Sequence, residues 1–156
     1  MKQEPYKKTE EFAMIKSIEP ILIFTGQAGQ AIELYKKAFG AQVKVHMLYS
    51  DADPKDFECK DEHKNFVYHA QLKIGEQIIM IADDCDAGVG GNQSKAFLID
   101  LVVQFDCDDE LKAAYELLSE GGTVTEPLCS QTYCSLACAL IDRFGGRWQL
   151  MSGYEG

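Results

Sequence analysis

The sequence predicts an α+β fold built from two tandem β-α-β-β-β modules. Three pairs of identical residues are separated by the same distance of 81 residues along the chain. The predicted elements also occur in the same order around those pairs, and self-similarity at one spacing is typical of duplicated architectures. A chain of 156 residues suits two such units sharing one core. The repeated pairs are Phe24 and Phe105, Gly40 and Gly121, and Val43 and Val124.

The first module is expected over residues 18–84. Its first strand, 18–25, is rich in β-branched and apolar residues. Apolar residues then recur at helical spacing over 27–39, and Gly40 is suited to cap that helix at its C-terminus. The other strands are expected over 42–49, 66–74 and 77–83, with an acidic loop over 50–65 and a tight turn at Gly75 and Glu76.

A polar, glycine-rich linker over 85–96 precedes the second module, residues 97–153. A strand over 97–105 is followed by a helix that ends at Glu120, where Asp106 or Asp108 is available to cap the first turn. We treat both modules as one structural domain. The remaining strands are expected over 123–128, 133–141 and 147–151, and the last places Arg147, Gln149 and Met151 on one face.

Composition excludes two classes of partner. The net charge of −10 opposes binding to nucleic-acid phosphates and to anionic lipid. The apolar stretch over 97–105 is interrupted by Asp100 and Gln104 and is too short to span a bilayer. Residues 1–17 form a polar arm without the apolar run of a signal peptide. We therefore expect a cytoplasmic protein with no nucleic-acid and no membrane partner.

The six cysteines do not follow a recognised metal or disulfide pattern. Cys129, Cys134 and Cys138 have the spacing C-x4-C-x3-C, and the chain contains no C-x2-C pair. Zinc sites usually show closer paired spacing, and disulfides are rare in the cytoplasm. We expect small buried hydrophobic side chains, and a redox-responsive role is a weaker alternative.

Three phrases carry a resemblance to a known family. They are ILIFTG at 21–26 with AIELYKKAFGA at 31–41, HAQLKIG at 69–75, and IDRFGGRW at 141–148. Together with the duplication, they resemble the vicinal-oxygen-chelate superfamily, which includes glyoxalase I, extradiol dioxygenases and bleomycin-resistance proteins, and most closely its PhnB-like branch. The resemblance spans about residues 18–151. It implies sheets that curl into a cup, a small-molecule site inside the cup, and a homodimer.

Metal-using members of the superfamily place one ligand on each of four strands. The resemblance puts these positions at Pro20, at Ile79 or Met80, at Asp100 and at Gln149. Proline and isoleucine have no ligating side-chain atom, and methionine is a soft ligand unsuited to the divalent ions used there. At most Asp100 and Gln149 remain. We expect no superfamily metal site and no cofactor, and weak binding of a divalent ion stays open.

Two polar residues on the predicted strands of the second module are candidate ligand contacts. Asp100 lies within an apolar strand, where an unpaired carboxylate is costly to bury. Either it binds a ligand or acts as a base, or it is solvated at an edge or paired with Arg143 or Arg147. Gln149 either offers its amide to a ligand or lies exposed at the rim.

Histidine and tyrosine complete the candidate set. His69, like His46, is either a general base near neutral pH or a packed strand residue. Tyr49 and Tyr133 are either polar handles in an apolar cup or plain core. The candidate ligand-binding residues are therefore His69, Asp100, Gln149, Tyr49, Tyr133 and Met80.

Two functions compete on these observations. The first is a small-molecule-binding protein of the glyoxalase and bleomycin-resistance type, which encloses its ligand between the modules. The second is a lyase, isomerase or dioxygenase-like enzyme with a non-standard metal set, or with a metal-free acid/base site at His69 or Asp100. The missing metal ligands favour binding. The identity of the ligand, and whether any reaction is catalysed, stay open.

Overall fold

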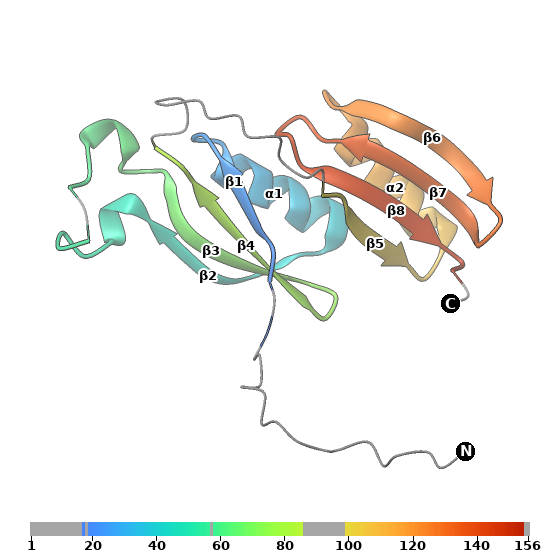
Figure 1. Cartoon of the computed structure of the whole chain (residues 1–156), viewed down its shortest axis with the longest axis horizontal. Helices are drawn as coiled ribbons and strands as arrows, with labels where there is room; N and C mark the ends of the chain where they lie inside the picture. Colours follow the sequence, from blue (N-terminus) through green and yellow to red (C-terminus); the bar gives the residue numbers. More distant parts are fainter. Residues whose placement is uncertain (1–16, 18, 57, 86–98, 155–156) are drawn as a thin grey trace, which may run out of the picture.

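The computed structural model describes residues 17, 19–56, 58–85 and 99–154. It contains two four-stranded sheets, and a helix of 12 residues packs on one face of each (Figure 1). The prediction of two β-α-β-β-β modules is confirmed, and the two sheets do not close on one another. The expected arm over 1–17 and linker over 85–96 lie outside the described residues, apart from residues 17 and 85.

The first module has the predicted elements in the predicted order. Their bounds are β1 Ile21–Phe24, α1 Ala28–Phe39, β2 Gln42–Leu48, β3 Val67–Ile74 and β4 Gln77–Asp83, with two short 3-10 turns, η1 Tyr49–Asp51 and η2 Asp61–His63. The sheet order is β1-β4-β3-β2, with β1 parallel to β4 and the other pairs antiparallel. Gly40 has a φ of 62° and ends α1 in the left-handed conformation that favours glycine.

The second module repeats this plan with the sheet order β5-β8-β7-β6. Its bounds are β5 Leu101–Phe105, α2 Asp108–Ser119, β6 Thr123–Gln131, β7 Cys134–Ile141 and β8 Arg147–Ser152. In this module, two boundaries differ from the prediction by three residues or more. Asp100 lies directly before β5 and not within it. Strand β6 extends beyond Leu128, because Cys129 and Gln131 continue its pairing with β7.

One hydrophobic core joins the two modules. The rings of Tyr35 and Phe39 on α1 lie with their centroids 5.1 and 4.7 Å from that of Trp148 on β8. Trp148 is the only tryptophan of the chain and is 1% exposed. Helices α1 and α2 also contact each other across the junction of the two modules. Described residues include no helix that is both long and apolar enough to cross a membrane.

The buried carboxylate of Asp142 connects the modules by hydrogen bonds. Its Oδ1 accepts from the backbone N–H groups of Phe144 and Gly146, at 2.8 and 3.0 Å. Its Oδ2 accepts from the Tyr35 hydroxyl and from the Trp148 indole N–H, both at 2.8 Å. Burial, followed by the charge of Asp142, raises the pKa of Tyr35, which keeps the phenol protonated as a donor.

Gly146 leaves the space that this arrangement needs. A Cβ at this position would lie 2.5 Å from the Asp142 Oδ2 and 2.6 Å from the Tyr35 hydroxyl oxygen. Any larger residue would therefore displace a buried polar atom from its partner. These close approaches explain the second glycine in the sequence phrase IDRFGGRW.

A second buried carboxylate organises the first module. Asp83 at the end of β4 accepts from the backbone N–H groups of Gly26 and Ala28 through Oδ1, and from that of Val67 through Oδ2. It thereby holds the N-terminus of α1 against the sheet. The register places Ser152 at the equivalent position of the second module, opposite Phe105 as Asp83 is opposite Phe24.

In the second module the carboxylate at this junction comes from the helix. Asp108, the first residue of α2, accepts hydrogen bonds from the hydroxyl groups of Ser152 and Ser135. Asp108 corresponds to Gln27 at the repeat spacing of 81 residues. Each module thus joins its helix to its sheet through one carboxylate, supplied by β4 in the first and by α2 in the second.

We expect Tyr35→Phe to lower the free energy of unfolding by about 1.5–3 kcal/mol, because it removes one hydrogen bond to a charged group. Asp142→Ala should lower it by about 3–5 kcal/mol, since four donors then lose their acceptor. Urea unfolding followed by circular dichroism measures both. Tyr115→Phe is the control, because no described residue bonds the Tyr115 hydroxyl. A Tyr35→Phe variant as stable as wild type would contradict this account.

Candidate ligand-binding site

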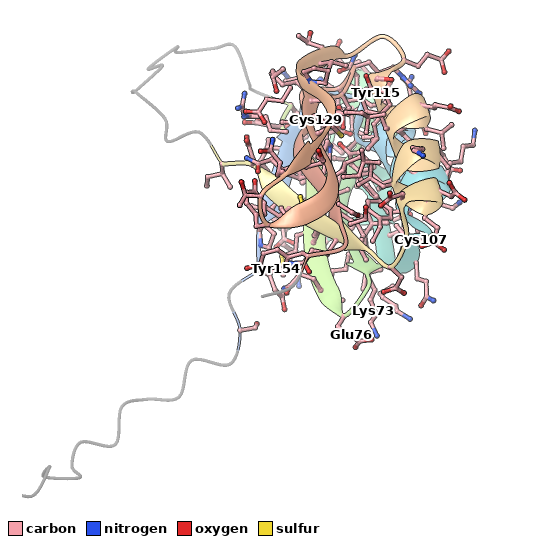
Figure 2. The ribbon with its side chains drawn as sticks, turned by 90° about the vertical axis from the view of Figure 1, so that its right-hand side faces the viewer. Lys73, Glu76, Cys107, Tyr115, Cys129 and Tyr154 are labelled. Atoms are coloured by element: carbon pink, nitrogen blue, oxygen red, sulfur yellow. The ribbon has the colours of Figure 1, made fainter. Side chains whose placement is uncertain are left out.

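Each sheet has one face covered by helix and core and one face that is not; we call the second the open face. On β8, Trp148 and Leu150 point into the core, so the alternating residues Arg147, Gln149 and Met151 lie on the open face. Figure 2 shows α2 on one side of the strands of the second sheet. Polar side chains gather on this open face.

Asp100, Arg147 and Gln149 form a hydrogen-bonded group there, the Asp100 cluster. The Asp100 Oδ1 lies 2.7 Å from Arg147 Nε, and its Oδ2 accepts from Gln149 Nε2 at 3.0 Å. The side chains of Arg147 and Asp100 are 31% and 24% exposed. The hydrogen bond from Gln149, followed by the contacts of Arg147, lowers the pKa of Asp100. Of the alternatives for Asp100, the structure shows the pairing with Arg147.

The cluster lies beside small and apolar side chains. Val102 on β5 and Ala139 on β7 flank Gln149 in the register. Ala137 pairs with Met151 in the same way, two residues further along β8. Among the described residues, Arg147 binds Asp100 through Nε, and none accepts from its two terminal nitrogens. The open face therefore combines an apolar surface with an oriented guanidinium and an amide.

The open face of the first sheet carries His69 and Met80. Met80 pairs with Gln71 on β3, and the Gln71 Nε2 lies 3.5 Å from His69 Nε2. On β1, Ile21 pairs with Met80, whereas Ile79 is buried in the core. The structure thus brings His69 and Met80 onto one sheet and Asp100 and Gln149 onto the other.

This register decides which residues occupy the superfamily's metal positions. Ile21, and not Pro20, shares the open face with Met80, because cross-strand partners point to the same side. Both oxygens of Asp100 are bound to side chains. Together with Gln149 these residues do not fit a divalent cation. Within the described part of the chain, no group of three or more His, Cys, Asp or Glu side chains is placed to hold a metal ion.

Tyr49 and Tyr133 lie away from the Asp100 cluster. The Tyr49 hydroxyl donates to the Asp83 carbonyl at 2.9 Å, and its ring packs against Tyr68 at 5.3 Å. Tyr133 lies in the β6–β7 turn, is 52% exposed, and packs against Tyr154. The six predicted residues are therefore distributed over four places in the structure.

The cysteines only partly follow the expectation of burial. Cys134 and Cys138 are buried, and burial raises the pKa of Cys138 to about 11, which makes its thiol unreactive at neutral pH. Cys107 and Cys129, in contrast, are exposed, because they lie at the N-terminus of α2 and on the edge strand β6. Cys59 and Cys85 are half-buried.

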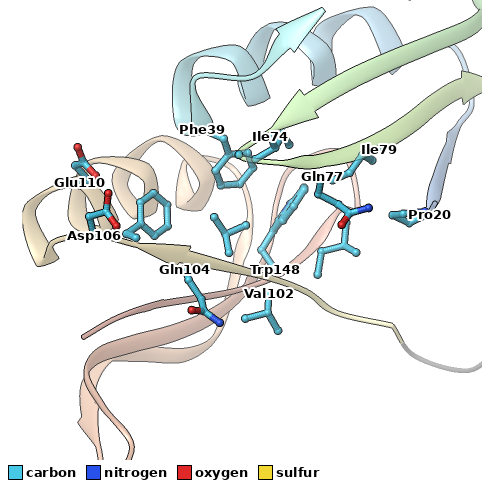
Figure 3. Close-up of a pocket in the computed structure, with 14 residues that line it drawn as sticks. Pro20, Phe39, Ile74, Gln77, Ile79, Val102, Gln104, Asp106, Glu110 and Trp148 are labelled. Carbon is cyan, nitrogen blue, oxygen red and sulfur yellow. The ribbon is translucent and has the colours of Figure 1, made fainter. Parts of the chain in front are cut away.

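A cavity with a volume of about 450 Å³ lies between the two modules (Figure 3). The sequence does not predict this cavity, because residues of both modules form its wall. The sequence pattern around Trp148 predicts only a core residue. None of the six predicted ligand residues lines it. The lining residues are Pro20, Phe39, Ile74, Gly75, Gln77 and Ile79 from the first module, and Leu101 to Asp106, Glu110 and Trp148 from the second.

Known structures share this fold over nearly the whole chain. Protein PA1353 from Pseudomonas aeruginosa is 25% identical with a TM-score of 0.74, covering 88% of this chain and 98% of its own. The PhnB protein from Bacillus cereus is 24% identical with a TM-score of 0.70, covering 88% and 99%. A glyoxylase/bleomycin resistance protein/dioxygenase domain from Frankia is 14% identical with a TM-score of 0.59, covering 92% and 96%.

None of the curated proteins matches the chain in sequence. The family model described as 3-demethylubiquinone-9 3-methyltransferase matches residues 16–151, which includes both modules. The resemblance expected from the three sequence phrases is therefore confirmed. The chain belongs to this family, the PhnB-like branch of the vicinal-oxygen-chelate superfamily.

Proposed function

We propose that the protein is a cytoplasmic small-molecule-binding protein that holds its ligand at the Asp100 cluster without a tightly bound catalytic metal. The observation that carries this proposal is the geometry of Arg147. Its Nε is bound to Asp100, while no described residue accepts from its terminal nitrogens. A guanidinium oriented in this way is suited to bind a planar oxygen group of a ligand.

The chemistry of the cluster supports binding more than catalysis. Asp100 accepts two hydrogen bonds and its pKa is lowered, so at neutral pH it is an ionised anchor for Arg147 and a poor base. Gln149 keeps its amide oxygen for a ligand donor. Val102 and Met151 supply apolar surface beside these groups. We infer a ligand that carries a carboxylate or similar acceptor on an apolar body.

The competing enzymatic hypothesis has less support. A metal-dependent reaction would need ligands where Ile21 and Met80 lie. A metal-free reaction would need a base close to the bound ligand, and His69 lies on the other sheet. The Frankia domain, which shares the fold, is named for three different activities. The fold alone therefore does not determine the activity, which must be inferred from the site.

We further propose that a second copy of the chain completes the ligand-binding site as a homodimer. Strands β1 and β5 are each an edge of their sheet. They carry Ile21, Ile23 and Val102 with exposed fractions of 50%, 53% and 51%, and Ile99 near β5 is 71% exposed. Exposed apolar edges are a template for association. Ile99 and Val102 lie on either side of Asp100 in sequence, so a partner covering them would adjoin the cluster.

Binding at the cluster is tested with benzoate and salicylate as carboxylate probes. Backbone amide NMR signals of Ala139 and Gln149 should shift on titration, and Arg147→Gln should weaken the affinity at least tenfold because it removes the charged fork. Arg143→Gln is the matched control, since that guanidinium lies 4.8 Å over the Phe144 ring. Shifts confined to other surfaces would contradict the proposal. So would a stabilisation by Zn²⁺ or Mn²⁺ that Asp100→Ala abolishes.

The lowered pKa of Asp100 gives an expected pH dependence. In the folded protein its carboxyl should titrate below the ordinary value of about 3.9. The pair therefore stabilises the fold above that pH, and this contribution is lost as the pH falls through the folded pKa. Side-chain carboxyl NMR measures the value directly. Gln149→Leu and Arg147→Gln should each raise it, and an unchanged pKa in both variants would contradict the network.

Ile23→Lys should convert the proposed dimer into a monomer, because a lysine at an apolar interface must be desolvated or excluded. Sedimentation velocity measures the mass of both proteins. Val124→Lys is the control, since Val124 is 38% exposed on the opposite edge strand β6. A monomeric wild-type protein, or an unchanged dimer in Ile23→Lys, would refute the interface.

A further inference from the structure

The cavity between the modules has the properties of a second binding site. Its volume of about 450 Å³ falls within the range of about 300–1,000 Å³ typical of small-molecule sites. Phe39 and Ile79 line it from the first module, and Val103, Phe105 and Trp148 line it from the second (Figure 3). These side chains can bury the apolar body of a ligand.

Two carboxylates stand at one end of this cavity. Asp106 and Glu110 lie close together there, across from Pro20 and Gln77 at the other end (Figure 3). Among the described residues neither carboxylate has a hydrogen-bond or ion-pair partner. The adjacent acids differ, because Asp108 binds Ser135 and Ser152 and Asp109 lies 4.0 Å from Lys112. The two acids that line the cavity are thus the two left unpaired at this turn.

The other lining groups also favour a positively charged ligand over a negatively charged one. Among the described residues, no lysine, arginine or histidine lines the cavity, and its other polar side chains besides the Trp148 indole are the neutral amides of Gln77 and Gln104. The net charge of −10 also concentrates cations near the surface. Glu110 lies in the first turn of α2, where the positive end of the helix dipole offsets part of its attraction for a cation. A preference of about tenfold for a cation is therefore reasonable.

We propose that this cavity binds small amphiphilic amines, with the apolar body between the modules and the ammonium group at Asp106 and Glu110. The site is separate from the Asp100 cluster, none of whose residues lines the cavity. Its ligand has the opposite charge to the carboxylate proposed for that cluster. The two sites can therefore be tested independently of each other.

Trp148 makes the test direct, because the only tryptophan of the chain lines the cavity. The probes are n-octylamine, n-octanol and octanoate, which share one apolar chain and differ in charge. We expect n-octylamine to change the indole emission saturably, with a dissociation constant at least tenfold below that of n-octanol, and octanoate to bind more weakly still. Calorimetric titration gives the same constants without relying on fluorescence.

The charge preference is then removed by substitution. In the double variant Asp106→Asn with Glu110→Gln, the n-octylamine constant should come within about twofold of the n-octanol constant, while n-octanol binding is unchanged. Both side chains are exposed, so the fold should tolerate them. Asp109→Asn is the control, and Arg147→Gln should leave n-octylamine binding unchanged. Equal affinities for all three probes, no saturable binding, or a preference that survives the double variant would each overturn the proposal.

Discussion

The carboxylate of Asp142 is the interaction on which the joined structure depends. It is buried, and its four donors come from the β7–β8 turn, from β8 and from α1 of the other module. A charge in the interior is tolerated only when hydrogen bonds replace its hydration. Here the same bonds that replace it also set the distance between the modules, because Tyr35 cannot reach Asp142 unless α1 packs against Trp148. Folding of the second module and docking of the first are therefore coupled at one residue.

The two faces of each sheet have different roles. The helix-covered faces supply the core, the inter-module cavity and the buried carboxylates. The open faces contain few buried large side chains and can vary in chemistry without loss of the core. The Asp100 cluster lies on such a face, and its three members come from β8 and from the residue before β5. A rigid scaffold with variable groups on one face suits a superfamily whose members bind different small molecules.

The order of elements and the C-terminal cap of α1 could be predicted, because the repeated order and Gly40 are visible in the sequence. The N-cap of α2 is Cys107, and not Asp106 or Asp108 as expected, because α2 begins at Asp108 itself. The partner of Asp100 could be reduced to two arginines, but choosing Arg147 required the register of β8 against β5. The same holds for Met80 over Ile79, since a shift of one residue reverses the face of every side chain in a strand. The extension of β6 was missed because Cys129 to Gln131 is polar. The inter-module cavity depends on how distant segments pack, and no local pattern encodes that.

Asp83 and Asp108, the carboxylates that join the helix to the sheet in each module, constrain how the duplicated halves diverged. The first module has Gln27 with Asp83, and the second has Asp108 with Ser152 at the matching places. Passing from one arrangement to the other takes two substitutions. One order of events creates an intermediate with two carboxylates facing each other, and the other order creates one with none. We expect either intermediate to be less stable than both ends, because like charges repel in the first and donors lose their acceptor in the second, so the exchange is an epistatic step. A chimera that combined α2 with the first sheet would recreate the two-carboxylate state, and the halves of this protein are no longer interchangeable parts.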